Sequence, residues 1–142
     1  MNKNIVFDID KKSGLSKEEL KGLMEKWQVK LNMLDWVLEL KIVDFNRPDF
    51  KQSGDFIADP KKKKATILLT SEPWRDDEEY TLVHEMVHVL FFDFDKFSEE
   101  SLLQSYKNQG KEHDLYMEKL ESLVHHVTQI LLGRKELTGS ER

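Results

Sequence analysis

The chain has 142 residues, with 22 basic and 27 acidic side chains that give a net charge of −5 at pH 7. This length suits one domain with its own core, and 35% charged against 39% apolar residues is typical of a globular protein with a polar surface. The acidic balance argues against a face built to bind nucleic acid. Because the chain has no cysteine, any metal must be held by His, Asp or Glu.

The beginning of the chain gives no sign of export. Residues 1–8 lack the apolar run and cleavage site of a signal peptide, and no stretch approaches about eighteen consecutive apolar residues. We therefore expect a cytoplasmic protein without a membrane span. Residues 1–142 are predicted to form a single domain, in which residues 134–142 are a frayed tail.

The first predicted elements are a helix and a strand. Ser16 and Glu19 have the spacing of a capping box, and apolar residues then recur at helical intervals to about Leu34. From Trp36 to Phe45 apolar and polar residues alternate, which predicts a half-buried strand.

Two further strands are expected at residues 54–58 and 65–70, and the second of these is the most apolar. The turn between them carries the lysine run 61–64. We interpret this run as a solvated turn that protects a sheet edge, rather than as a nucleic-acid patch. The acidic run 76–79 is interpreted as the cap and solvated first turn of the next helix.

That next helix contains His84-Glu85-x-x-His88 and is predicted to run to about Asp93. Two histidines at positions i and i+4 lie one turn apart on one helix face, so both imidazoles can reach one metal ion. Glu85 can then act as the general base for a water bound to that metal. The helix is apolar on nearly every side, which predicts a buried central helix whose polar groups need partners.

The remaining chain is expected to form a connection and one more helix. Residues 94–111 are interpreted as a connection with a short helix starting at Ser98, and as a candidate mobile rim over the site. The last helix is predicted from about Glu112 to Leu132, with Gly133 as its C-terminal stop.

A catalytic zinc takes three protein ligands and one open position, so a third ligand must come from outside the metal helix. Glu121 lies at the edge of the apolar stripe of the last helix and is favoured, whereas Glu118 lies on the solvated side. His113 is a rival if the helix extends that far. His125 and His126, one turn beyond Glu121, can bind substrate or hydrogen-bond a ligand.

Two stretches of the chain resemble the motifs of a known family. Residues 81–90 read TLVHEMVHVL, and residues 121–127 read ESLVHHV, with apolar residues three and six positions after the Glu. Both are similar to the motifs of the compact zincin-fold metallopeptidases found on phages and other mobile elements. Those proteins are related to the enzymes that cleave phage-immunity repressors and to minimal gluzincins.

This resemblance implies an α+β, zincin-like fold. It would consist of an N-terminal helix, a small three-stranded, mostly antiparallel sheet, the metal helix and a C-terminal ligand helix. The resemblance implies His84, His88 and Glu121 as ligands of Zn²⁺ and Glu85 as the base. In that fold the last strand before the metal helix, here residues 65–70, has a free edge that a peptide substrate can extend.

A weaker resemblance concerns residues 109–116, QGKEHDLY, which are similar to the third-ligand motif of the SprT-like proteases. It would make His113 the third ligand. SprT-like proteases act on DNA–protein crosslinks and carry DNA-binding parts, whereas this chain is acidic and has no cysteine zinc ribbon.

The sequence therefore predicts a zinc-dependent endopeptidase that cleaves a specific protein substrate through water activated by Glu85. The alternative is a non-catalytic, zinc-binding regulatory or interaction module, in which His113 or His125 closes the zinc site as a fourth ligand. Two histidines and a carboxylate suit zinc best, although iron, manganese and cobalt also accept them. Four residues remain open as stabilisers of the oxyanion: Tyr106, Tyr116, His125 and His126.

Overall fold

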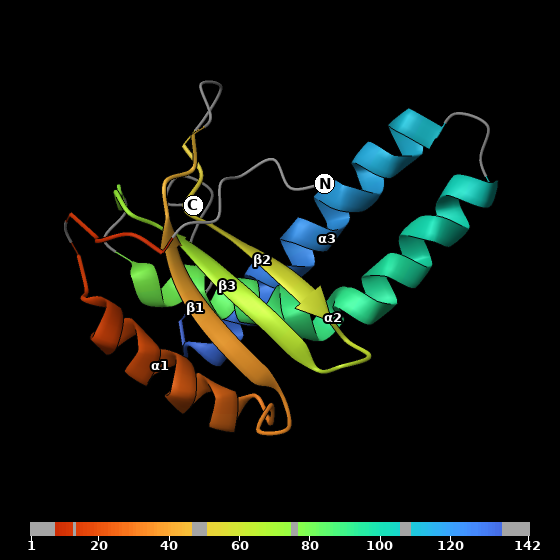
Figure 1. The fold of residues 1–142 in the computed structure, drawn as a ribbon. Coiled ribbons are helices and arrows are strands. Elements are labelled where there is room, and N and C mark those ends of the chain that lie inside the picture. The colour runs from red at the N-terminus through yellow and green to blue at the C-terminus, as the bar shows by residue number, and fades with distance from the viewer. Residues whose placement is uncertain (1–7, 13, 47–50, 75–76, 106–108, 135–142) are drawn as a thin grey trace. The chain divides into compact units, whose positions relative to one another are not determined.

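The computed structural model describes residues 8–12, 14–46, 51–74, 77–105 and 109–134. In chain order the elements are α1 (Lys17–Lys30), β1 (Val37–Val43), β2 (Gly54–Asp59), β3 (Lys64–Thr70), α2 (Glu78–Ser105) and α3 (Gln109–Leu131) (Figure 1). The predicted α+β class is confirmed. The chain divides into two compact units, residues 1–89 and 90–142, and the boundary falls within α2. None of the described helices is long and apolar enough to cross a membrane.

Helix α1 begins at the predicted capping box. The Ser16 hydroxyl accepts from the Glu19 amide at 3.1 Å, and the Glu19 carboxylate accepts from the Ser16 amide at 2.9 Å. The helix ends at Lys30 rather than near residue 34, because Asn32 adopts a left-handed φ of 58°. Its buried face consists of Leu20, Met24 and Trp27.

The three strands form one sheet in the order β1-β3-β2. Strand β3 is parallel to β1 and antiparallel to β2, so the sheet is mixed, and the expectation of a mostly antiparallel sheet is wrong for β1. The expectation that residues 65–70 present a free edge is also wrong, because β3 is the central strand. Ile67, Leu68 and Leu69 are at most 2% exposed, as expected of a strand covered on both faces.

Strand β2 is an edge strand within the described part of the chain. The turn at residues 60–63 joins it to β3, and Lys63 adopts a left-handed φ of 54° there. This turn contains three of the four lysines, and Lys64 begins β3. The interpretation of the lysine run as a solvated turn agrees with the exposure of all four side chains.

The first part of α2 is buried, as its all-round apolar sequence predicts. It passes behind the sheet in the view of Figure 1. Asp77 caps the helix, because its carboxylate accepts from the Tyr80 amide at 3.1 Å. The buried apolar side chains of this part are Leu82, Val83, Met86, Val87 and Val89.

The acidic residues after Asp77 do not form a solvated first turn, contrary to the prediction. Glu78 accepts from the Leu15 amide at 2.7 Å and pairs with Lys11. Glu79 accepts from the Trp27 indole at 2.8 Å. These contacts hold α1 and the segment before it against the start of α2. Asp76 lies outside the described residues.

In the second unit, α2 continues to Ser105 and α3 begins at Gln109, so the predicted connection at residues 94–111 is wrong for residues 94–105 and 109–111. The helix continues because this stretch contains no glycine or proline to end it. Helix α3 starts at Gln109, and Gly133, with a φ of 70°, ends it as predicted. The Gly133 amide donates to the Ile130 carbonyl at 3.0 Å. The predicted tail from residue 135 onward lies outside the described residues.

Candidate metal centre

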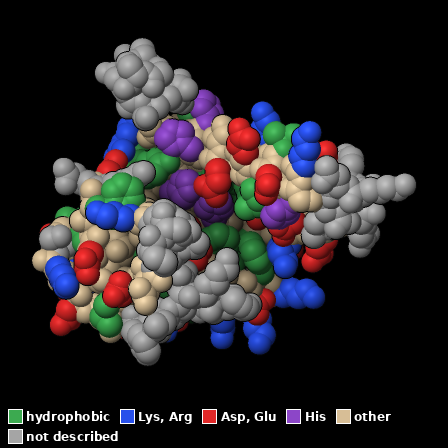
Figure 2. All heavy atoms as spheres, turned by 90° about the horizontal axis from the view of Figure 1, so that it is seen from above, with side chains coloured by type: hydrophobic (Ala, Val, Ile, Leu, Met, Phe, Trp, Pro, Cys, Tyr) green, Lys and Arg blue, Asp and Glu red, His purple; other side chains and the backbone are tan. Residues whose placement is uncertain are grey.

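The candidate metal centre starts from His84 and His88, which lie one turn apart on α2. Their ring centroids are 4.9 Å apart, with an angle of 69° between the ring planes. His88 is 7% exposed and His84 is half-buried. Histidine side chains reach the surface of the molecule in the space-filling view (Figure 2). The helical spacing therefore brings the two imidazoles together, as the sequence predicts.

Two aromatic rings hold these imidazoles. Phe56 of β2 stacks on His88, with centroids 5.3 Å apart and planes 12° from parallel. Tyr80 lies 5.5 Å from His84 on the same helix, at an angle of 36°. Such contacts restrict ring rotation and so prepare the nitrogens for a ligand. Sequence reasoning missed both residues. Of the two, only Tyr80 could have been predicted to contact a ligand, since it precedes His84 by one helical turn.

Glu85 lies beneath the start of β2 and is 8% exposed. A Cβ atom added to Gly54 would lie 2.8 Å from Thr81 Cγ2 and 3.2 Å from both Cγ and Oε2 of Glu85. The backbone of β2 therefore approaches α2 so closely that any larger residue at this position would clash with Thr81. The carboxylate of the predicted base is thus positioned by a strand that lies about thirty residues earlier in the chain.

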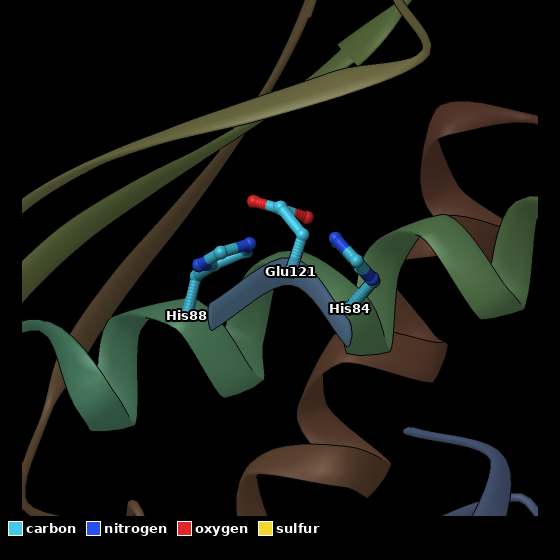
Figure 3. A group of neighbouring side chains, drawn as sticks. All are labelled: His84, His88 and Glu121. Carbon is cyan, nitrogen blue, oxygen red and sulfur yellow. The ribbon is translucent and has the colours of Figure 1, made fainter. Parts of the chain in front are cut away.

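The residue favoured as the third ligand, Glu121, belongs to α3 and is exposed. One ligand atom from each of His84, His88 and Glu121 lies within 4.8 Å of the other two, and Figure 3 shows the three side chains as one group. No other group of at least three His, Cys, Asp or Glu residues in the described ranges meets this criterion.

The rival ligands are placed elsewhere. Glu118 is exposed and does not belong to the group. His113 Nε2 contacts the Glu99 carboxylate of α2, so its imidazole is engaged within the second unit. His113 does not belong to the group of three.

Of the four residues considered for the oxyanion, Tyr116 has an evident structural role. Its hydroxyl donates to the Asp95 carboxylate at 2.7 Å. Burial, together with this hydrogen bond to the neighbouring carboxylate, raises the pKa of Tyr116 to about 12. His125 is half-buried, His126 is exposed, and neither belongs to the three-residue group. Tyr106 lies outside the described residues.

The donor set fits zinc. Two imidazoles and one carboxylate form a common set of protein ligands in catalytic zinc sites.

Comparison with protein-family models and with curated proteins finds no match to this chain. The argument for a function therefore rests on the residues and their geometry.

Proposed function

We propose that this protein is a zinc-dependent endopeptidase whose zinc is held by His84, His88 and Glu121. The observation that carries the proposal is the proximity of these three side chains, with the buried Glu85 beside the first of them. When bound, zinc would supply Lewis-acid activation of water and of a peptide carbonyl. Three protein ligands leave a tetrahedral position open for this chemistry.

Within this proposal, Glu85 is the general base. Its carboxylate takes a proton from the attacking water and returns the proton to the nitrogen of the leaving amine. Its carboxylate lies close beneath Gly54, and a placement set by a strand is what a positioned base requires. Phe56 holds the His88 ring and shields it from water on the stacked side.

The outer edge of β2 is the place where we propose that the substrate binds, replacing the edge predicted at residues 65–70. Two backbone groups of this strand bond to side chains instead of β3. The Gly54 carbonyl accepts from the Gln52 amide at 3.1 Å, and the Phe56 amide donates to Asp55 Oδ1 at 2.8 Å. A peptide strand that displaces these two side chains gains backbone bonds next to Glu85 and His88.

Metal content tests the proposed site. We expect about one zinc per chain in the wild type by elemental analysis, and loss of that zinc in His84→Ala and Glu121→Ala. Glu118→Ala is the matched control, because Glu118 is also an exposed glutamate of α3 but lies outside the group. Retention of zinc in Glu121→Ala and its loss in Glu118→Ala would contradict the proposed ligand set.

Peptide hydrolysis tests the proposed activity. The probe is a mixed peptide library, and cleavage is detected by mass spectrometry. We expect cleavage by the wild type, and Glu85→Gln should keep its zinc while its rate falls by about 10²–10⁴-fold, because the base is lost. Zinc binding without cleavage in either protein would instead support the non-catalytic module. That alternative predicts a fourth ligand, but His113 contacts Glu99, and His125 is not part of the three-residue group.

A further inference from the structure

An apolar cavity opens between the two helices of the second unit. Its volume is about 260 Å³, and the side chains around it include Phe94, Tyr116, Leu120 and Leu123, with Asp95 and Lys119 among them. All of these residues belong to the second part of α2 or to α3. None of them takes part in the proposed zinc site, so the cavity requires a separate explanation.

The apolar side chains beside this cavity are unusually exposed. Phe94 is 73% exposed, Phe97 is 69% exposed and Leu123 is 51% exposed. Of the described side chains between residues 90 and 134, only Val124 and Thr128 are buried. Phe94 and Leu123 line the cavity, and Phe97 follows Phe94 by three residues on α2. Single exposed apolar residues are common on protein surfaces, but several on the two helices that form an apolar cavity indicate an interaction site.

The spacing of these residues indicates what kind of partner fits. Leu90, Phe94 and Phe97 follow one another at intervals of four and three residues, and Tyr116, Leu120 and Leu123 repeat these intervals. Alternation of four and three is the spacing of a coiled-coil seam, whose side chains insert between those of a neighbouring helix. Two helices with such seams are complementary to two further helices of the same kind, as in a four-helix bundle.

The charges at the cavity favour a second copy of this chain as the partner. Asp95 and Lys119 carry opposite charges and both line the cavity. One oxygen of Asp95, Oδ1, accepts from the Tyr116 hydroxyl, and the other oxygen is the one proposed to pair with lysine. In a two-fold symmetric pair, residue i of one copy faces residue j of the other, and residue j faces residue i. Asp95 of each copy can therefore pair with Lys119 of the other, so the face is complementary to itself.

We propose that the face formed by Phe94, Phe97 and Leu123, together with the cavity lined by Phe94 and Leu123, binds a second copy of this chain. The product is a two-fold symmetric dimer in which four helices share one apolar core. The proposal does not depend on zinc or on peptide hydrolysis. A monomeric protein that binds zinc would contradict the dimer and leave the zinc site standing. A dimeric protein without zinc would contradict the zinc site and leave the dimer standing.

Sedimentation velocity of the full chain over a range of concentrations tests this dimer. We expect a dimer for the wild type and a monomer for Leu123→Lys, because a charge would be buried in the shared core. Leu115→Lys is the matched control, since Leu115 is a leucine of the same helix that is 50% exposed and does not line the cavity. A wild type that remains monomeric at about 100 µM, far above the dissociation constants typical of stable interfaces, overturns the proposal. Equal dissociation by both lysine variants also overturns it.

A charge exchange provides a second test that keeps the apolar face intact. Lys119→Asp gives each copy two acidic residues at the cavity, and Asp95→Lys gives each copy two basic residues. We expect each variant alone to dissociate more readily than the wild type, and an equimolar mixture to form a heterodimer. Circular dichroism shows whether each variant keeps its helices. Two folded variants that do not associate when mixed would refute the pairing of Asp95 with Lys119 between copies.

Discussion

Gly54→Ala is the most direct test of how β2 and α2 meet. The added methyl would lie 2.8 Å from Thr81 Cγ2 and 3.2 Å from Glu85 Oε2. The glutamate carboxylate is the end of a flexible side chain and can move by a few tenths of an ångström. The Thr81 methyl cannot easily do so, because it is attached directly to Cβ of a residue that is 7% exposed. The clash with Thr81 therefore dominates.

The expected loss of stability follows from two opposing terms. Overpacking of a filled interior costs about 1–3 kcal/mol. Alanine in place of a strand glycine recovers roughly 0.5–1 kcal/mol, because it lowers the entropy of the unfolded chain. At the midpoints of these two ranges the free energy of unfolding falls by about 1.3 kcal/mol. A fall of this size lowers the melting temperature by roughly 3–6 °C in a domain of this length.

A double-mutant cycle isolates the contact. Thr81→Ser removes the clashing methyl but keeps the hydroxyl, which donates to the Asp77 carbonyl at 3.5 Å. Urea unfolding of the metal-free protein gives the four free energies without a contribution from zinc. We expect Thr81→Ser to relieve most of the cost of Gly54→Ala, with a coupling energy of about 1 kcal/mol. Additive effects, or a Gly54→Ala variant as stable as the wild type, would refute the close approach.

Three further predictions concern Lys11, Phe56 and His113. Burial lowers the pKa of Lys11 from 10.5 to about 8, so between these values the unfolded chain binds more protons than the folded protein. The free energy of unfolding should therefore rise with pH across this window. Its dependence on pH, measured by urea unfolding at several pH values, should be weaker in Lys11→Met. The same dependence in both proteins would exclude Lys11 as its cause. Phe56→Leu keeps an apolar side chain but loses the stacking on His88, so zinc affinity in a competition with a chelator should weaken by about tenfold. An unchanged affinity would show that the ring does not orient the ligand. His113→Ala removes a partly exposed pair with Glu99, so it should lower the free energy of unfolding by only about 0.2–1 kcal/mol and leave the zinc content unchanged. Loss of zinc in this variant would restore His113 as a ligand.

The parts of the fold that the sequence predicts correctly depend on local chemistry. The capping box at Ser16, the cap at Asp77 and the stop at Gly133 each need only a few neighbouring residues. The pairing of His84 with His88 is likewise local, because helical geometry alone places them one turn apart. For this reason the prediction of the metal helix needed no knowledge of the sheet.

The parts that the sequence does not predict depend on contacts between distant residues. Alternation within each strand says nothing about the order β1-β3-β2. The free edge at residues 65–70 is implied only by the resemblance, and the structure has the edge at β2 instead. The length of α2 was also missed, because Ser98 and the acidic residues after it resemble a helix start, although they lie within a continuous helix. The contacts of Gly54 with Glu85 and of Phe56 with His88 depend on the position of β2, which the sequence does not reveal.

The correction of the strand order strengthens the proposed mechanism. Gly54 and Phe56 are two residues apart on β2, so their side-chain positions lie on the same face of the sheet. This face contacts Glu85 and His88. The Gly54 carbonyl and the Phe56 amide bond to side chains instead of β3. A peptide that bonds to these groups would be held by the same two residues that lie against the proposed base and one proposed ligand. The proposed binding of the substrate and the proposed chemistry thus depend on a single strand, and a shift of its register by one residue would turn both positions away from α2.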